Sequence, residues 1–266
     1  MSTNTAEPTI DEVAAYWNRR PCNVRHSPRA VGSREFFDEV EERKYFVEPH
    51  IPGFADFPRW KGKRVLEIGC GIGTDAVNFV RAGASYSAIE LSEESLALTK
   101  RRFEIYGLDG NLVLGNAEQL DQLFGTQQFD LVYSFGVIHH TPRPRAVIDA
   151  ARRVIRPDGE FRLMLYARNS WKALMIEAGL DQPEAQFGCP IALTFTEDDV
   201  RRLLDGAFEV ETITQDHIFP YVVEKYVKYE YEVQPWFREM PEEMFTALQR
   251  RLGWHLLITA RPSLGQ

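Results

Sequence analysis

The chain has 266 residues, of which 44% are apolar and 26% are charged, and these proportions are ordinary for a globular protein. No stretch approaches the roughly twenty apolar residues of a membrane span, and the first eight residues lack the apolar core of a secretory signal. The net charge of −8 argues against a nucleic-acid partner, and three widely spaced cysteines favour a reducing, cytoplasmic compartment and predict no disulfide framework.

The first 60 residues are expected to form a helical lid. Thr9 and Glu12 have the spacing of a capping box, and the apolar residues that follow recur with helical periodicity as far as Trp17. A second, highly charged helix is predicted over residues 34–47. A loop rich in proline and glycine, residues 49–58, then leads into the next segment.

Residues 61–266 alternate between strand and helix patterns with short connections, which is typical of a doubly wound, mainly parallel α/β sheet. Pro157–Gly159 reads as a turn that leads into the fifth strand. Two insertions, residues 169–195 and 215–250, fall outside the pattern and are expected to cover the substrate. The predicted seven strands lie near residues 64–68, 85–90, 111–115, 129–133, 160–167, 208–214 and 253–260, and the helices near 74–82, 93–106, 143–154 and 196–204.

The first predicted strand ends in three glycines at alternate positions, Gly69, Gly71 and Gly73, and Thr74 then opens a helix. Such a turn lets backbone approach a ligand without a Cβ in the way. A dinucleotide-binding loop would place its third glycine one residue later, so a dehydrogenase is the weaker alternative. Glu90 ends the second strand, where a carboxylate accepts the ribose hydroxyls of either NAD or S-adenosylmethionine.

Together with the turn after the third strand and the run from Phe129 to Pro142, this loop resembles the motifs of class I S-adenosylmethionine-dependent methyltransferases. The resemblance is to the small-molecule branch of that family and covers roughly residues 60 to 168. It implies a Rossmann-like fold and S-adenosylmethionine as cofactor. Asn116 stands where the family usually has an aspartate that reads adenine. The cofactor-binding residues that the resemblance implies are Glu67, Gly69, Gly71, Gly73, Glu90, Leu91, Asn116, Ala117, Glu118, Ser134 and Phe135.

His139 and His140 follow the fourth strand, close to where the acceptor atom lies in this family. Either histidine is a candidate general base for an oxygen or nitrogen acceptor; alternatively, both are structural. Tyr166, at the end of the fifth strand, is a further catalytic candidate. We predict no metal site from the histidine pair, because adjacent residues seldom reach one ion and no third ligand has suitable spacing.

Two segments supply candidate substrate-binding residues. Arginine side chains after the first helix have the chemistry to clamp a carboxylate or phosphate, or they are simply solvated. The aromatic side chains of insertion 215–250 suit a cationic or flat acceptor, although Val222, Tyr226, Tyr229 and Val233 would share one packed helical stripe. The candidates are Tyr16, Trp17, Arg19, Arg20, Arg25, Tyr221 and Tyr231.

The sequence therefore predicts a methyltransferase that acts on a small molecule, with transfer to oxygen or nitrogen favoured over carbon. Two alternatives stay open. One is an enzyme that cyclises or cleaves S-adenosylmethionine itself, and the other is a protein that binds this cofactor without turnover. The acceptor is not identified, and the pattern fits a monomer and a homodimer equally.

Overall fold

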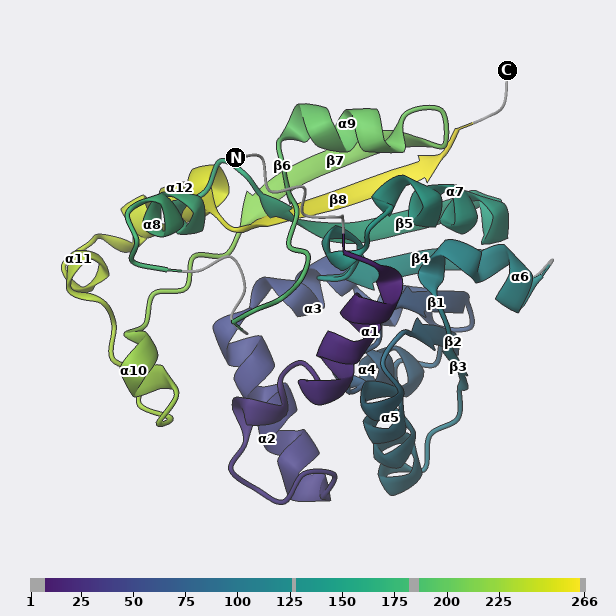
Figure 1. The fold of residues 1–266 in the computed structure, drawn as a ribbon, viewed down its shortest axis with the longest axis horizontal. Coiled ribbons are helices and arrows are strands. Elements are labelled where there is room, and N and C mark those ends of the chain that lie inside the picture. Colours follow the sequence, from purple (N-terminus) through teal and green to yellow (C-terminus); the bar gives the residue numbers. More distant parts are fainter. Residues whose placement is uncertain (1–7, 126–127, 182–186, 264–266) are drawn as a thin grey trace, which may run out of the picture.

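The computed structural model describes residues 8–125, 128–181 and 187–263. Within these residues the chain forms one eight-stranded sheet flanked by helices (Figure 1). The strands are β1 (Arg64–Ile68), β2 (Ser85–Glu90), β3 (Asn111–Leu114), β4 (Phe129–Phe135), β5 (Ile155–Ala167), β6 (Thr194–Phe195), β7 (Phe208–Asp216) and β8 (His255–Pro262).

The strand order β3-β2-β1-β4-β5-β8-β7 confirms the predicted doubly wound sheet. Strands β1 to β5 are parallel, whereas β8 runs antiparallel to both β5 and β7. One further strand, β6, was not predicted. It is short and runs parallel to β5, with Thr194 opposite Tyr166. In a sheet of this topology, ligands bind at the carboxyl ends of the parallel strands.

The longer predicted helices are confirmed, and several short ones were not predicted. Thr9 Oγ1 accepts the backbone N–H of Glu12 at 3.3 Å, which completes the predicted capping box. The helices are α1 (Ile10–Arg19), α2 (Arg34–Val47), α3 (His50–Ala55), α4 (Thr74–Arg81), α5 (Glu93–Tyr106), α6 (Leu120–Phe124), α7 (Pro144–Val154), α8 (Trp171–Glu177), α9 (Glu197–Leu204), α10 (Val223–Tyr226), α11 (Pro235–Arg238) and α12 (Glu242–Leu252), with 3-10 turns η1 (Val24–His26), η2 (Phe57–Trp60), η3 (Ala117–Gln119) and η4 (Ile138–His140).

Two apolar clusters cover the sheet, one on each face. Helices α6, α7 and α9 contribute to the cluster that contains Val132 and Phe161. Helices α4 and α5 contribute to the cluster that contains Phe79 and Tyr133. Burial of this kind stabilises a fold by about 25 cal/mol per Å² of apolar surface, so the sheet holds the strand ends, and the residues that follow them, in fixed positions.

The predicted loop over residues 49–58 is wrong, because α3 and η2 occupy it. Ala55, Phe57 and Trp60 are buried in the same cluster as Val65 of β1. The periodicity was obscured by Pro49, Pro52 and Pro58, which fall at or near helix starts and do not break them. Residues 36–60 thus contribute to the core, and the lid role predicted for the N-terminal segment stays a prediction, which we now confine to α1.

A buried ion pair also joins the N-terminal helices to the sheet domain. Arg102 of α5 is fully buried, and its Nη2 lies 2.6 Å from Glu41 Oε2 of α2. The other guanidinium nitrogen, Nη1, donates to Thr74 Oγ1 at 2.9 Å. Removal of one partner from a buried pair leaves an uncompensated charge and is strongly destabilising. Helices α2 and α5 are therefore locked together.

Two further predictions are corrected. Residues 157–159 do not form a turn before the fifth strand, because they lie inside β5. A bulge interrupts the pairing of β5 with β4 there: Phe129 pairs with Ile155, and Leu131 pairs with Glu160. The predicted aromatic stripe of insertion 215–250 is also absent. Helix α10 has only four residues, and Tyr229 has a left-handed backbone with φ of 65°.

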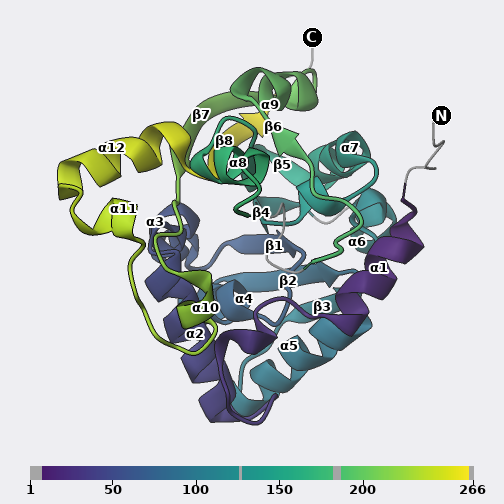
Figure 2. The same ribbon diagram turned by 60° about the vertical axis from the view of Figure 1, so that its left-hand side comes forward.

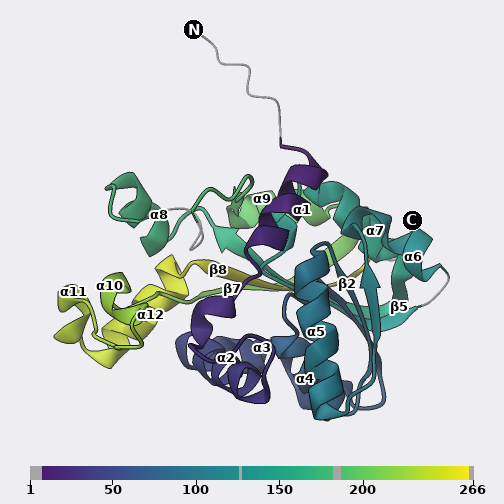
Figure 3. The ribbon, with the colours of Figure 1, turned by 60° about the horizontal axis from the view of Figure 1, so that its bottom comes forward.

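Helix α1 lies beside α5, whereas the segment that carries α10 to α12 extends from β7 on the side away from α6 (Figures 2 and 3). Asn18 holds α1 against α5, because its side-chain oxygen accepts two hydrogen bonds at the start of α5. The donors are Ser92 Oγ at 3.0 Å and Glu94 N at 3.3 Å. Among the described helices, none has the length and apolar character needed to cross a bilayer.

Candidate functional site

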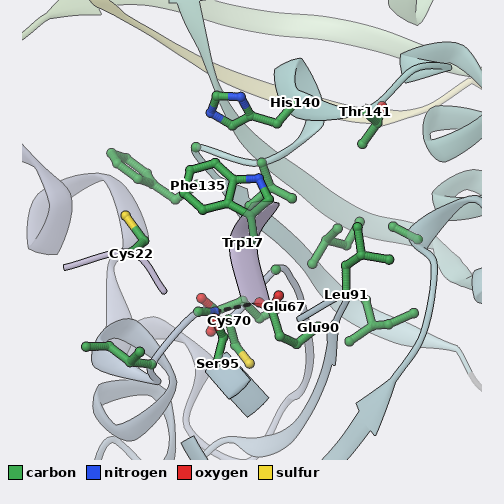
Figure 4. A pocket seen from close by; sticks show the side chains of 18 of the residues that line it. Trp17, Cys22, Glu67, Cys70, Glu90, Leu91, Ser95, Phe135, His140 and Thr141 are labelled. Carbon is green, nitrogen blue, oxygen red and sulfur yellow. Dashed lines mark hydrogen bonds between the residues drawn. The ribbon is translucent and has the colours of Figure 1, made fainter. Parts of the chain in front are cut away.

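A cavity lies at the carboxyl ends of β1, β2 and β4, and α1 covers it. Its lining includes the glycine turn after β1, Glu90 at the end of β2 and Phe135 at the end of β4. Trp17 of α1 lines it from the opposite side. In the view of Figure 4, Trp17 lies between His140 above and the two carboxylates Glu67 and Glu90 below.

The glycines of the turn have different roles. Gly69 has φ of 74°, and a Cβ on it would lie 2.4 Å from Val137 Cγ2. Gly71 has φ of 56°, and a Cβ there would meet no atom within 4 Å. Gly71 therefore leaves open space beside the cavity that it lines. Gly73 is the N-cap of α4 and packs closely against Thr99, and it does not line the cavity.

The carboxylate of Glu90 is fixed by backbone donors. Its Oε2 accepts the N–H of Gly71 at 2.8 Å, and its Oε1 accepts the N–H of Ser92 at 2.9 Å. Burial raises its pKa, and these N–H donors act in the opposite direction because they stabilise the charged form. The backbone N–H of Leu91 also acts on this carboxylate, whose remaining lone pairs can accept hydrogen bonds from a ligand.

A second set of polar groups forms the cavity wall behind the glycine turn. Glu67 is buried, accepts the hydroxyl of Tyr86 at 2.5 Å and has its pKa raised to about 8, chiefly by burial and then by nearby Asp75. Asp75 itself accepts Lys44 Nζ at 3.1 Å and the hydroxyl of Tyr133 at 3.0 Å. Lys44 and both carboxyl groups line the cavity, so the wall combines a neutral acid with a buried ion pair.

The turn after β3 supplies the remaining polar edge. Asn116 lines the cavity together with Ala117, and its side-chain oxygen accepts the backbone N–H of Glu118 at 3.0 Å. That bond caps η3 and fixes the orientation of the amide. Glu118 turns away and pairs with Arg143 instead. The amide of Asn116 is thus held in place beside the lining residue Leu91.

His140 closes the far end of the cavity. Its Nδ1 lies 2.5 Å from the carbonyl oxygen of Ile191, and Trp17 packs against its ring edge-on with 5.2 Å between the centroids. A carbonyl only accepts, so Nδ1 carries the proton and Nε2 is the basic nitrogen. Both His140 and Trp17 line the cavity.

Comparison with known proteins identifies the central part of this chain. Residues 65–159 match a family model described as a methyltransferase domain. A ubiquinone biosynthesis O-methyltransferase of Salmonella paratyphi A is 31% identical over 120 residues, which cover 45% of this chain and 49% of that protein. A Mycobacterium ulcerans protein named as a phthiotriol/phenolphthiotriol dimycocerosates methyltransferase is 35% identical over 130 residues, covering 46% and 48%. The chain spans about half the length of these relatives.

Residues 65–159 are a class I S-adenosylmethionine-dependent methyltransferase domain.

Solved structures confirm the fold of this methyltransferase domain and its flanking helices. The magnesium protoporphyrin IX methyltransferase of Synechocystis PCC 6803 aligns with a TM-score of 0.59 at 16% identity and covers 98% of this chain and 100% of that chain. The [4+2]-cyclase SpnF aligns with a TM-score of 0.61 at 15% identity and covers 98% of both chains. At such identities the likeness concerns the fold alone.

Most of the predicted cofactor residues line the methyltransferase cavity. The exceptions are Gly73, which shapes the turn, Glu118, which is paired outside the cavity, and Ser134, which is fully buried behind it. Ser134 is excluded because side chains alternate along β4, so its neighbour Phe135 takes the cavity side. The predicted residues that do line the cavity are Glu67, Gly69, Gly71, Glu90, Leu91, Asn116, Ala117 and Phe135.

Of the predicted catalytic residues, the structure brings only His140 to the cavity of the methyltransferase domain. His139 is fully buried, and its ring lies 3.7 Å from that of Tyr166, centroid to centroid. Burial lowers the pKa of His139 well below its usual range, so its ring is neutral. Tyr166 is stacked on its other side by Trp254 at 4.5 Å. Neither His139 nor Tyr166 lines the cavity, and their catalytic roles stay predictions.

The arginines of the predicted carboxylate clamp do not reach the cavity, and the clamp stays a prediction. Arg19, Arg20 and Arg25 are exposed and lie outside the cavity lining. Arg20 Nη1 donates to the carbonyl of Phe187 at 2.6 Å instead. The reason is the amphipathic character of α1, which turns its apolar face towards the cavity and its basic end towards solvent. Tyr16, on the buried face, contacts Trp17 edge-on at 5.1 Å but does not line the cavity.

Tyr221 and Tyr231 do not line the cavity either. Both pack against Phe46, with ring centroids 6.0 Å and 4.8 Å from it. They belong to an aromatic cluster around the buried guanidinium of Arg43, which lies 3.9 Å from the ring centroid of Tyr226. The ring of Tyr231 thus faces a cation of the protein itself, with 5.8 Å from its centroid to Arg43, and the substrate-binding role of both tyrosines stays a prediction.

The sequence reasoning missed Lys44 and Asp75, which form the buried ion pair in the cavity wall. Asp75 immediately follows Thr74, so an acidic residue in the first turn of the helix after the glycine turn was the available signal. The sequence does not single out Lys44, because this residue is one of many charged residues on the predicted helix 34–47, and nothing in the pattern distinguishes a buried charge from a solvated one. Only the packing of α2 against α4 brings these two side chains together.

Proposed function

We propose that this protein transfers a methyl group from S-adenosylmethionine to an oxygen or nitrogen atom of a small molecule. The observation that carries the proposal is the continuity of one cavity, which runs from the glycine turn and Glu90 to His140 beneath α1. The same space therefore holds the residues suited to an adenosine cofactor and a base suited to an acceptor.

We assign the cofactor to the lining residues by their chemistry. Glu90 would accept the two ribose hydroxyls, because its carboxylate is held with lone pairs available at the end of β2. Asn116 and the backbone of Ala117 would read the adenine edge, with Leu91 against the ring. Gly71 would admit the methionine part, because it leaves the cavity open where a side chain would intrude.

Bound S-adenosylmethionine would supply an electrophilic methyl group on a sulfonium. The chain has to orient the acceptor and exclude water, which together account for much of the rate of an in-line displacement. Trp17 suits both tasks. It covers the cavity from α1, and its ring face attracts a cationic centre more strongly than water does once the site is closed.

His140 is the proposed general base. The bond from its Nδ1 to the carbonyl of Ile191 fixes the tautomer in which Nε2 takes up a proton. Nε2 would take up the proton that an acceptor oxygen or nitrogen loses on methylation. A positioned base of this kind contributes about 10²- to 10⁴-fold to a rate.

The remaining assignments are coarser. The acceptor is a small molecule in this proposal, without a nucleic-acid partner, and α1 acts as the lid over it. A cytoplasmic location is supported by the three cysteines, all of which carry free thiols. A homodimer and a monomer both stay compatible with this chain.

The test is product identification with S-adenosylmethionine that carries a labelled methyl group. The chain is incubated with panels of phenols, carboxylic acids and amines, and the nucleoside product is separated. The proposal predicts S-adenosylhomocysteine in equal amount to a labelled acceptor. Methylthioadenosine as the product would instead establish a cyclase or lyase, and tight cofactor binding without any product would establish a binding protein.

A further inference from the structure

A group of potential metal ligands lies outside the cavity, where the end of α2 meets β7 and β8. Glu48, His217 and His255 each offer one ligand atom, and these atoms all lie within 4.8 Å of one another. Together with His50, half of the chain's six histidines gather here from three distant segments. We propose that Glu48, His217 and His255 bind a divalent transition-metal ion, with Zn²⁺ as the best match to the ligands.

The types of ligand define the class of metal. Two imidazoles and one carboxylate are the set that Zn²⁺ uses in sites that keep a fourth position open, whereas Mg²⁺ and Ca²⁺ require oxygen ligands. Bonds of about 2.0–2.1 Å would bring the ligand atoms to about 3.3 Å from one another. Most of this shortening of the distances between ligand atoms can come from movement of the Glu48 side chain, because that side chain is partly exposed and lies at the end of a helix.

The ring of His255 is already oriented for this role. Its Nε2 faces Glu48 Oε1 at 3.8 Å, and its Nδ1 lies 3.0 Å from His50 Nε2. If His255 Nδ1 donates to His50, the lone pair of Nε2 points towards the proposed ion. Metal-bound histidines almost always donate their second N–H to such a partner. His50 is accordingly a positioning residue.

His217 has a strained backbone that aims it at the same point. Its φ is 73°, which residues other than glycine rarely adopt. Its N–H donates to Asp216 Oδ1 at 2.7 Å, and its carbonyl accepts the N–H of Trp254 at 2.7 Å. The ring then stacks on His255 with 4.5 Å between centroids. Backbone strain of this kind is concentrated at functional sites.

The charges around the group allow a cation to enter. The two nearby ammonium groups are both paired: Lys44 with Asp75 and Lys172 with Asp181, each at 3.1 Å. The carboxylates of Glu48 and Asp216 supply the negative charge at the group itself.

The proposed metal site is separate from the methyltransferase cavity and independent of the proposed function. The ring of Phe135, which lines the cavity, lies between them, with centroids 6.0 Å from His50 and 5.5 Å from His255. An ion held there would tie the end of α2 to β8 and thereby fix the wall that carries Phe135. The readouts for this site are therefore metal content and stability.

The experiment uses the full chain without a histidine tag, stripped with a chelator and then titrated with Zn²⁺ in a calorimeter. We expect one Zn²⁺ per chain and a rise in melting temperature. Glu48→Gln and His217→Ala should each weaken binding at least tenfold, and His50→Phe should weaken it by about 10- to 100-fold, as expected of a second ligand shell. Cobalt substitution should give the visible absorption of a site with nitrogen and oxygen ligands.

His26→Gln is the matched control, because His26 is an equally buried histidine at a different place, beside Tyr226. It should bind Zn²⁺ as the parent chain does. Absence of saturable binding by the parent chain would overturn the proposal, as would unchanged binding by a folded His217→Ala chain. If His217→Ala does not fold, Glu48→Gln decides the matter alone, since an amide keeps the size of this partly exposed side chain.

Discussion

The backbone N–H of Gly71 donates a 2.8 Å hydrogen bond to Glu90 Oε2 and thereby joins the glycine turn after β1 to the end of β2. This bond holds the carboxylate of Glu90 beside Gly71. Of the three glycines in the turn, Gly71 alone has open space where a Cβ would lie. The ribose-binding group and the path for the rest of the cofactor are thus arranged before any ligand arrives, which reduces the ordering cost of binding.

The first prediction concerns this carboxylate. Glu90→Ala removes the acceptor proposed for the ribose, and we expect S-adenosylmethionine binding to weaken by about 1.5–3 kcal/mol, the range for hydrogen bonds to a charged group. Calorimetry measures the change. Glu118→Gln is the control, because Glu118 is paired with Arg143 outside the cavity, and it should leave affinity unchanged. Equal losses in both variants would contradict the assignment of Glu90.

The second prediction separates two glycines of the same turn. Gly71→Ala should cost only about 1 kcal/mol of stability through its positive φ, yet its methyl group would enter the cavity and abolish cofactor binding. Gly69→Ala should cost about 2–4 kcal/mol, because strain adds to the clash with Val137. Urea unfolding measures both effects. An unstable Gly71→Ala chain, or one that binds normally, would refute this account of the turn.

The third prediction concerns acid–base chemistry. His140→Gln should lower turnover by about a hundredfold, while the affinity for S-adenosylmethionine changes little, because the proton is transferred only in the chemical step. Single-turnover rates and calorimetry on one preparation provide both numbers. Parallel losses of rate and cofactor affinity would show that His140 has a structural role instead.

The fourth prediction is a pH dependence of stability. Burial, with Asp75, raises the pKa of Glu67 to about 8, whereas an unfolded glutamate titrates near pH 4.3. Between these values the folded chain keeps a proton that the unfolded chain releases. The contribution of Glu67 to stability is therefore full below about pH 4.3 and falls with rising pH by up to about 1.4 kcal/mol per unit until about pH 8.

Glu67→Gln tests this, because an amide can still accept the hydroxyl of Tyr86 but does not titrate. Without cofactor, the variant should gain stability relative to the parent chain as the pH rises from 5 to 8. The difference between the two urea-unfolding curves isolates Glu67 from other titrating groups. A constant difference, or one with the opposite sign, would show that Glu67 is ionised in the folded chain.

The fifth prediction concerns α1. A ten-residue helix has little stability of its own, and the bonds of Asn18 to the start of α5 and the contact of Trp17 with His140 are among those that attach α1. Hydrogen exchange over residues 9–26 should therefore slow when S-adenosylhomocysteine is added, while exchange in α2 stays constant. Exchange that is already slow without ligand would make α1 a permanent part of the wall.

The central sheet could be predicted because β1 to β4 are short apolar runs with a turn at each end. The glycine turn, Glu90 and Asn116 could be placed for the same reason, since they directly follow strands whose carboxyl ends meet at one edge. The bulge in β5 and the helices α3 and η2 could not. In both places proline signals a break, and only tertiary packing decides that the chain continues.

Of the predicted substrate-binding residues only Trp17 lines the cavity, because chemistry alone does not say which way a side chain points. Arg19, Arg20 and Arg25 have suitable groups for a clamp, yet all three are exposed and lie outside the cavity lining. Tyr221 and Tyr231 are aromatic, yet they pack against each other, and Tyr231 lies near Arg43, a cation on a different predicted helix. The histidine group near Glu48 was missed because its members are dispersed along the chain and meet only through the sheet.

A crystal structure of the chain with S-adenosylhomocysteine tests the central claim most directly. The account predicts that both ribose hydroxyls lie within hydrogen-bonding distance of Glu90, that adenine lies against Asn116, and that the sulfur faces Trp17 and His140. A ligand bound elsewhere, or one whose ribose makes no contact with Glu90, would contradict the account.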